Sequence, residues 1–200
     1  MSRHIVKVFN QTVAEDDTLY HLGDWSFGGL ANVWNFRKQL RCKNIHLIYG
    51  NHDNHIKNNK ELPNVFMTYR EEQAQYTDGT WSRDIERIPN GLSDLIGDPA
   101  YAKELFTSTN DVLTVKHGSH AFFLSHYSHQ IWLGSHKSII HLFGHSHDSI
   151  KGIGKSMDVG IDVAKRLLGE YKPFSIEEII NIMDKKEVVF LDKHNPKTNI

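Results

Sequence analysis

"LIYGNHDNHI", residues 47–56, combines the pattern of a buried strand with the chemistry of a binding site. Its first three residues are apolar, and the chain then turns at Gly50. Asn51, His52 and Asp53 follow directly, and these side chains coordinate metals, donate protons and accept hydrogen bonds. The stretch therefore predicts a strand that ends in metal-ligand chemistry, for which the rest of the chain must supply partners.

Three other apolar runs end in a similar way. They are "TLYHL" (18–22) before Gly23-Asp24, "HAFFL" (120–124) before Ser125-His126, and "SIIHLF" (138–143) before Gly144-His145-Ser146-His147. In open α/β sheets, sites form at the carboxyl ends of the strands. Each run therefore delivers a small residue and then a ligand type to one rim of a sheet.

The resulting ligand set contains Asp24, Asn51, His126, His145 and His147. Carboxylate, amide and imidazole ligands without a thiolate suit Mn, Fe or Zn. The single cysteine of the chain excludes a disulfide framework and a thiolate site. Two such ions roughly 3.5–4 Å apart can activate a water and hold the oxygens of an in-line displacement. The pattern predicts phosphoester hydrolysis.

Other histidines carry a plainer interpretation. His21, His46 and His141 each lie inside an apolar run. A lone histidine in such a run is more often a core or surface residue than a ligand, so we expect no metal contact from these three.

The order of apolar patterns predicts one α/β domain over residues 1–200. A helix at 3–14, a strand at 18–22, a helix marked by Leu30 to Leu40 and a strand at 44–49 favour parallel pairing. Later we expect a hairpin of 111–117 and 120–125, strands at 138–143, 156–163 and 187–191, and a helix after the Ser175-x-x-Glu178 capping box. Residues 57–110 are predicted to be an insertion or lid, with a helix near 99–106.

Composition limits the partners. The chain has 23 Lys+Arg against 24 Asp+Glu, so no basic field attracts nucleic acid, which we expect only as a substrate. No apolar run reaches the length of a membrane helix, and the start "MSRHIVKVFN" lacks the apolar core of a signal peptide. We expect a cytoplasmic protein that does not enter membranes. The oligomeric state stays open.

The motifs "GD", "GNHD", "SHY" and "GHSH", in that order, resemble the calcineurin-like metallophosphoesterase family. The later "DVGIDV…PFSIEEI" resembles the closing strand and helix of its small single-domain bacterial and phage members. This resemblance implies a two-sheet α/β sandwich flanked by helices. It also implies a metal-dependent phosphoesterase that hydrolyses a phosphate mono- or diester with two divalent ions, of which Mn is favoured over Fe or Zn.

The resemblance also implies individual roles. Asp24 would bridge the two ions, and the ligands of one ion would be completed by Asn51, His126 and His145. His147 would bind the other ion. His52 would stabilise the transferring phosphoryl group or protonate the leaving oxygen, and Asp53 would orient His52.

One family motif is absent from its expected place. The family opens with a strand that ends in Asp-x-His, and no Asp-x-His precedes Gly23. The resemblance therefore implies that the first strand is missing and that one ion has only Asp24 and His147. Three readings remain open: a fragment or a pseudo-enzyme that acts as a binding or regulatory module, a mononuclear site, or ligands from elsewhere. Asp192-Lys193-His194, after "EVVFL" (187–191), would serve in a circularly permuted arrangement.

Overall fold

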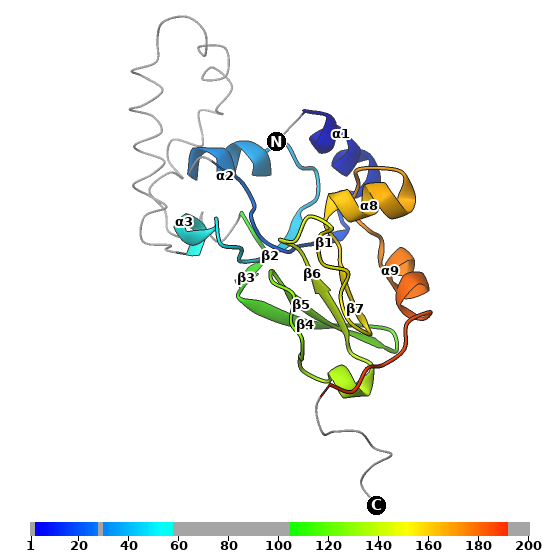
Figure 1. Cartoon of the computed structure of the whole chain (residues 1–200). Coiled ribbons are helices and arrows are strands. Elements are labelled where there is room, and N and C mark those ends of the chain that lie inside the picture. Colours follow the sequence, from blue (N-terminus) through cyan, green and yellow to red (C-terminus); the bar gives the residue numbers. More distant parts are fainter. Residues whose placement is uncertain (1–2, 28–29, 58–104, 192–200) are drawn as a thin grey trace, which may run out of the picture.

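Two β-sheets form the centre of the molecule (Figure 1). The computed structural model describes residues 3–27, 30–57 and 105–191. The first sheet is parallel, in the order β1 (Thr18–His21), β2 (Asn44–Ile48), β3 (Ser108–Asn110). The second has the order β4 (Val112–His117), β5 (His120–Ser125), β6 (Ile140–Phe143), β7 (Ser156–Asp158), and only β4 and β5 pair antiparallel in it.

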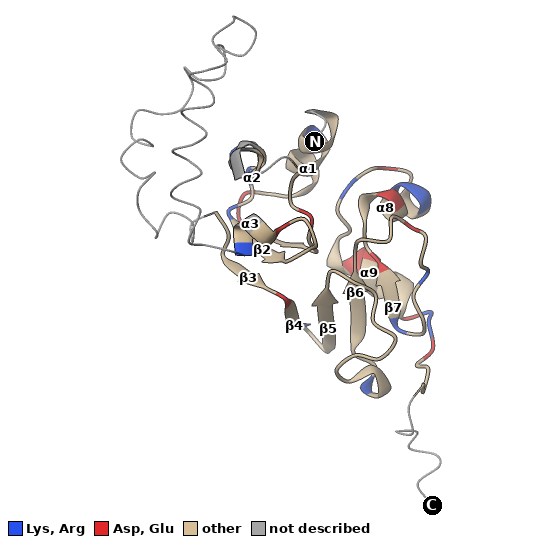
Figure 2. Cartoon of the chain, turned by 60° about the vertical axis from the view of Figure 1, so that its left-hand side comes forward, with Lys and Arg blue, Asp and Glu red and all other residues tan. Residues whose placement is uncertain are grey.

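Helices flank both sheets. Beside the first sheet lie α1 (Arg3–Thr12), α2 (Leu30–Arg37) and α3 (Asn54–Lys57); beside the second lie α8 (Ile161–Leu168) and α9 (Ile176–Met183) (Figures 1 and 2). A short 3₁₀ helix, η1, spans Ser135–Lys137. This arrangement confirms the predicted α/β fold of two sheets flanked by helices.

Helix formation follows the sequence signals. In α1, Val6 and Phe9 are buried at helical spacing and pack into the core of the first sheet. In α9, Ser175 caps the helix: its side chain accepts the N–H of Glu178, and the Glu178 carboxylate accepts the N–H of Ser175. The reciprocal bonds confirm the predicted capping box.

Strand β2 connects two hydrophobic cores. Ile45, Leu47 and Ile48 are fully buried, as expected for a strand covered on both faces. Ile45 and Leu47 belong to the core under α1 and α2, whereas Ile48 belongs to the core of the second sheet. The "GNHD" loop therefore leaves β2 at the junction between the sheets.

The predicted hairpin of β4 and β5 is confirmed. Its end pair is His117 with His120, and Gly118 takes a positive φ of 57° in the turn between them. A Cβ at Gly118 would have no heavy atom within 4 Å, so the turn is open to solvent. It lies at the end of β5 opposite to His126.

Two predicted strands are corrected by the structure. The strand expected at 156–163 ends at Asp158, and α8 begins at Ile161 after the N-cap Gly160. Its alternating apolar residues fit a short strand and a helix equally, and such runs are ambiguous by pattern alone. The strand expected at 187–191 is also wrong: these residues form no strand, and the side chains of Val189 to Leu191 are exposed.

Most of the expected insertion lies outside the described residues, which omit 58–104. The helix expected near 99–106 falls largely in that range, and its described end, Leu105 and Phe106, is not helical. Both side chains are buried in the first core. Residues 105–110 therefore belong to the main fold, with 108–110 forming β3.

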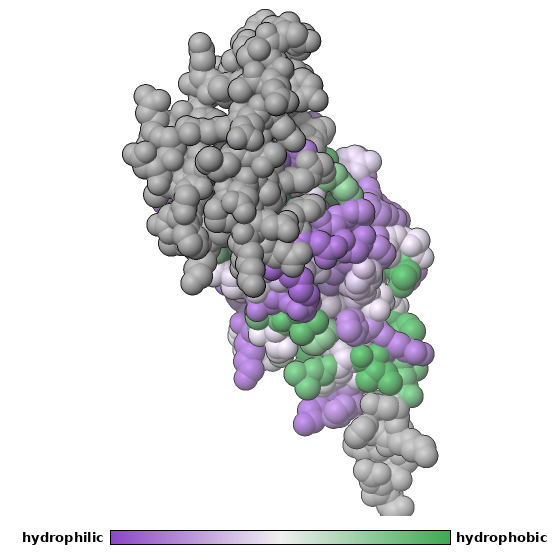
Figure 3. All heavy atoms as spheres, turned by 90° about the vertical axis from the view of Figure 1, so that its left-hand side faces the viewer, coloured by the Kyte–Doolittle hydropathy of each residue, from purple (hydrophilic) through white to green (hydrophobic). Residues whose placement is uncertain are grey.

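Acidic and basic residues are both scattered over the described part of the chain (Figure 2). On the face drawn in Figure 3, apolar surface forms separate patches among polar ones. Within the described ranges, no helix has the length and apolar character needed to cross a membrane.

Candidate metal centre

Four predicted ligands meet where the two sheets adjoin. Asp24 follows β1, Asn51 follows β2, His126 follows β5 and His145 follows β6. His126 Nε2 lies 3.0 Å from Asn51 Oδ1, 3.1 Å from His145 Nδ1 and 3.5 Å from Asp24 Oδ2. Ligand atoms of Asp24, His126 and His145 all lie within 4.8 Å of one another. We call these four residues the metal cluster.

The tautomer of His126 makes the cluster suited to a cation. His126 Nδ1 lies 2.7 Å from the carbonyl oxygen of Leu22, which can only accept, so Nδ1 carries the proton. In a neutral imidazole, Nε2 then presents a lone pair to the Asn51 oxygen and to the Asp24 carboxylate. Lone pairs repel at such distances, and a cation among them removes the repulsion.

The spacing also fits a metal ion. Ligand atoms about 2.1 Å from a common ion lie about 3.0–3.4 Å apart in octahedral or tetrahedral geometry. The contacts of His126 Nε2, at 3.0, 3.1 and 3.5 Å, fall close to this range. Two imidazoles, a carboxylate and an amide oxygen suit a first-row divalent ion.

Glycines allow the loops to approach. A Cβ at Gly23 would lie 2.3 Å from His126 Nδ1 and 2.7 Å from the Cα of Gly50. A Cβ at Gly50 would lie 2.2 Å from Asp24 Oδ1. Any larger residue at either position would push the two loops apart. The glycines of "GD" and "GNHD" are therefore needed for the close approach of these loops to each other.

The Asp53 carboxylate ties the "GD" loop to the "GNHD" loop. It is buried, and it accepts the backbone N–H groups of Asp24 at 2.8 Å, Trp25 at 2.9 Å and Gly50 at 2.8 Å. We expected Asp53 to orient His52, but its described contacts are these backbone groups. Asp53 therefore holds Asp24 in place, and His52 touches Asp24 through its own N–H, 2.9 Å from Asp24 Oδ1.

A second buried carboxylate, Asp158, holds the "GHSH" loop. It accepts the Ser146 hydroxyl at 2.5 Å, the N–H of Asp148 at 3.1 Å and the N–H of Gly160 at 2.7 Å. The sequence analysis did not single out Asp158. Asp158 opens the "DVGIDV" stretch quoted for the family resemblance, at the end of β7 and two residues before Gly160.

Backbone strain gathers in the same loops. Among the described non-glycine residues, five have positive φ, and four of these are Asp24 at 55°, His145 at 61°, His147 at 45° and Asp148 at 65°. Such conformations persist only where surrounding contacts enforce them, and they concentrate at functional sites.

His147 is not brought into the cluster. Its side chain is 81% exposed, and its Nδ1 lies 2.9 Å from Asp162 Oδ2 in the first turn of α8. Since a carboxylate accepts, Nδ1 donates to Asp162, and Nε2 remains free to bind a ligand. Asp162 is a further residue that the sequence analysis missed.

Aromatic rings pack on the site histidines. The Phe27 ring lies 4.8 Å from that of exposed His52. The Tyr127 ring lies 4.8 Å from that of His126 and 4.7 Å from that of His145. Tyr127 lies in the "SHY" motif, but its packing was not predicted, and no sequence signal marked Phe27.

Of the three histidines expected to avoid metal, His141 is buried, and His21 and His46 are half-buried. His46 Nδ1 pairs with the Ser108 hydroxyl, and burial lowers the pKa of His46. His141 accepts the N–H of His129, and burial lowers its pKa to about 4. Burial likewise lowers the pKa of His21 to about 4, although the charges of Asp53 and Asp24 oppose the shift.

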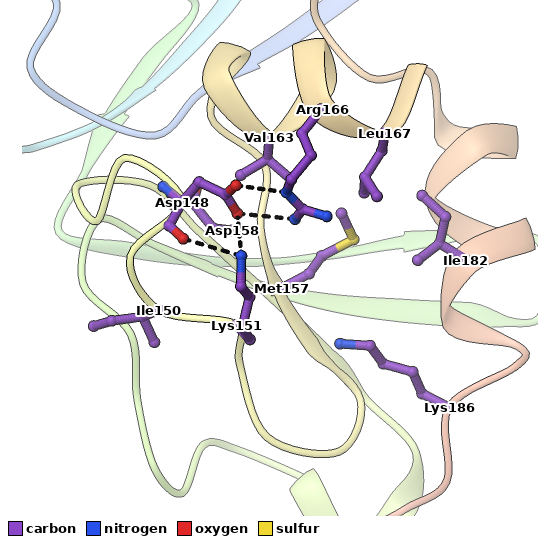
Figure 4. Close-up of a pocket in the computed structure, with 10 residues that line it drawn as sticks. All are labelled: Asp148, Ile150, Lys151, Met157, Asp158, Val163, Arg166, Leu167, Ile182 and Lys186. Atoms are coloured by element: carbon purple, nitrogen blue, oxygen red, sulfur yellow. Dashed lines mark hydrogen bonds and ion pairs between the residues drawn. The ribbon is translucent and has the colours of Figure 1, made fainter. Parts of the chain in front are cut away.

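A separate pocket of about 250 Å³ lies behind the "GHSH" loop (Figure 4). Arg166 from α8 and Lys151 both pair with Asp148 at its edge. The Asp148 pKa falls to about 2 because Arg166 and then Lys151 donate hydrogen bonds to it. Apolar side chains, including Met157 and Val163, line its wall.

Comparisons with known proteins agree with this architecture. The chain is similar to a solved structure described as "The Crystal Structure of the Protein of Unknown Function AQ665 from Aquifex aeolicus". The TM-score is 0.51 at 19% identity, over 90% of this chain and 83% of that chain, which supports the fold alone. A search of curated proteins found no match. A profile of the calcineurin-like phosphoesterases matches residues 2–196, nearly the whole sequence, and the chain therefore belongs to the calcineurin-like phosphoesterase family.

Proposed function

We propose that this chain is a metal-dependent phosphoesterase that hydrolyses a phosphate mono- or diester through a dinuclear centre. The observation that carries the proposal is the convergence of Asp24, Asn51, His126 and His145, whose ligand atoms lie 3.0 to 3.5 Å from His126 Nε2. Family membership supports a phosphoesterase role. Mn²⁺ is the proposed metal, with Fe or Zn as alternatives, and we propose a cytoplasmic location.

Each residue of the centre has a proposed role. The metal cluster would hold one ion, while Asp24 and His147 would hold the second, with Asp162 orienting His147. Bound ions supply charge for the phosphoryl oxygens and acidity for an attacking water. Exposed His52 stands beside Asp24 and would donate a proton to the leaving oxygen. Asp53 keeps Asp24 in position.

The proposal is tested by Mn²⁺-dependent hydrolysis of bis(p-nitrophenyl) phosphate together with metal content. Asp24→Asn and His126→Ala should each abolish hydrolysis and lower bound Mn, because each removes a ligand from the cluster. Asp16→Asn and His117→Ala are matched controls, since both residues are exposed and outside the cluster. Retained hydrolysis in Asp24→Asn or His126→Ala would overturn the assignment.

One observation favours a second candidate, a one-ion binding or regulatory module. Among the described residues, three residues form the only group of histidines, cysteines and carboxylates close enough to hold an ion, and His147 lies outside it. Elemental analysis separates the two candidates. Two Mn per chain favour the enzyme, whereas one Mn without hydrolysis favours the module.

A further inference from the structure

Two exposed aromatic side chains contact histidines of the proposed centre, one after a strand of each sheet. Phe27 follows the "GD" loop after β1 and is 65% exposed. Tyr127 follows His126 at the end of β5 and is 50% exposed. Neither side chain belongs to the buried cores beneath the sheets. Their exposure is therefore not a by-product of core packing.

Each ring is anchored on a histidine of the proposed centre. Phe27 packs at 4.8 Å on His52, with the ring planes 59° apart. Tyr127 packs at 4.8 Å on His126 and at 4.7 Å on His145, with plane angles of 74° and 67°. These tilted contacts occupy part of each ring and leave the exposed remainder to solvent. The exposed part of each ring therefore lies beside a histidine of the proposed centre.

Basic side chains offer the substrate no comparable contact beside the metal cluster in the described part of the chain. In the described part of the chain, no lysine or arginine forms a hydrogen bond or ion pair with Asp24, His52 or the cluster histidines. A phosphate would be held by the ions, so the neighbouring part of the substrate would meet aromatic surface. Aromatic side chains bind planar aromatic groups by stacking, and nucleobases of every kind stack in this way.

We propose that the substrate is a phosphoester that carries a nucleobase, and that Phe27 and Tyr127 bind the base beside the metal cluster. This inference rests on the proposed phosphoesterase function. It assigns the two residues a role in specificity, while the ions and His52 act on the phosphate.

The test compares two ligands that differ only in the base. These are the phosphonate analogues of AMP and of ribose 5-phosphate, whose C–P bonds resist hydrolysis. Calorimetry on the Mn-loaded full chain should give a Kd about 10-fold lower for the AMP analogue, within the range that base stacking provides. The double variant Phe27→Leu/Tyr127→Leu should lose this preference, with the Kd of the ribose analogue within about 2-fold of the parent value.

Matched controls are Phe190→Leu and Tyr171→Leu, which replace exposed aromatic residues distant in sequence from the cluster. Both controls should keep the base preference. A parent chain without preference, or a double variant that retains it, would overturn the inference.

The same samples are assayed with p-nitrophenyl phosphate and bis(p-nitrophenyl) phosphate, a monoester and a diester, and hydrolysis of either separates the two proposals. Hydrolysis without a base preference overturns the inference and leaves the phosphoesterase standing. A base preference without hydrolysis supports nucleobase binding and overturns the phosphoesterase.

Discussion

The two halves of the candidate centre are held in different ways. In the half built on the first sheet, Asp53 accepts only backbone N–H groups and joins two loops directly. In the half built on the second sheet, Asp158 accepts a hydroxyl and two N–H groups, and the loop continues outward to Asp148. Asp148 in turn pairs with Arg166 and Lys151 at the surface (Figure 4).

This difference separates a fixed part from an adjustable part. Buried hydrogen bonds to backbone groups are little affected by salt, whereas exposed ion pairs are screened. Asp24 is held by a hydrogen bond from its backbone N–H to the buried Asp53 carboxylate. His147, whose side chain is 81% exposed, is held by its contact with Asp162 near the surface. We infer that the position of Asp24 is fixed by folding, while that of His147 adjusts to its surroundings.

The largest expected effect comes from the exposed histidines of the two halves. His52→Ala should lower kcat on the order of 100-fold, the scale of a lost acid–base group, while metal content stays unchanged. His147→Ala should instead lower bound metal, because it removes a proposed ligand. Initial-rate hydrolysis assays measure kcat of both variants, and elemental analysis measures their bound metal. Loss of metal in His52→Ala would mean that His52 is a metal ligand, and the two histidines would then not differ in role.

The two buried carboxylates should differ in their contribution to stability. Asp53→Asn places an NH₂ group against the N–H of fully buried Trp25, which costs about 3 kcal/mol of unfolding free energy. Asp158→Asn should cost about 1 kcal/mol, because its NH₂ can donate to the Ser146 hydroxyl, and the N–H that loses its partner is that of part-buried Asp148. Urea unfolding of the metal-free chains measures both. Equal costs would contradict the proposed difference between the halves.

Acid should weaken the second sheet through His141, as it should the first through His21, whose pKa burial also lowers to about 4. His141 is neutral when folded, with its pKa lowered to about 4 by burial, whereas an unfolded histidine titrates near about 6.5. The unfolded chain therefore binds a proton first, and about 3 kcal/mol of stability is lost as the pH falls from about 6.5 to about 4.

His141→Gln removes this titration and should flatten the pH dependence of the urea midpoint over that interval. His46→Gln, at a half-buried histidine of the first sheet whose pKa burial also lowers, should flatten the profile less. If the two variants flatten the profile equally, the deeper burial of His141 does not set the size of its effect.

The smallest effect is expected from Arg166→Gln. The variant removes the Arg166 hydrogen bonds that contribute most to lowering the pKa of Asp148 to about 2, and with them the charge of the guanidinium. A carboxyl with a lowered pKa stabilises the fold above its ordinary pKa, near about 4, and this contribution is lost as the pH falls toward about 2. At pH 7 the urea midpoint should fall slightly in low salt and not measurably in 1 M NaCl, because the pair is exposed. A large loss that persists in high salt would contradict a surface role.

The sequence predicted the strands that carry the ligands because each signal was local. An apolar run followed by a glycine or serine and then a ligand residue gave β1, β2, β5 and β6, and four of five predicted ligands meet in the structure. Parallel pairing then brings separate strand ends to one place, which follows from general rules of α/β folds.

What sequence reasoning missed depends on contacts between distant segments. The Asp53 carboxylate reaches Asp24 and Trp25 across about 28 residues, and no local pattern reports such a bond. Polar β3 lacks a strand signal, yet it pairs with β2. "EVVFL" has the composition of a strand, but a strand requires a partner edge, and 187–191 has none in the described structure.

The open hairpin turn gives the molecule a convenient attachment point. Ser119 is exposed in that turn, and the length of β5 puts it roughly 20 Å from the metal cluster. The single cysteine, Cys42, is buried, and burial raises the pKa of its thiol. Ser119→Cys would therefore place one exposed, reactive thiol on the molecule, while the Cys42 thiol stays buried. A dye or surface tether placed there would report on ligand binding from a distance, without touching the residues that carry the chemistry.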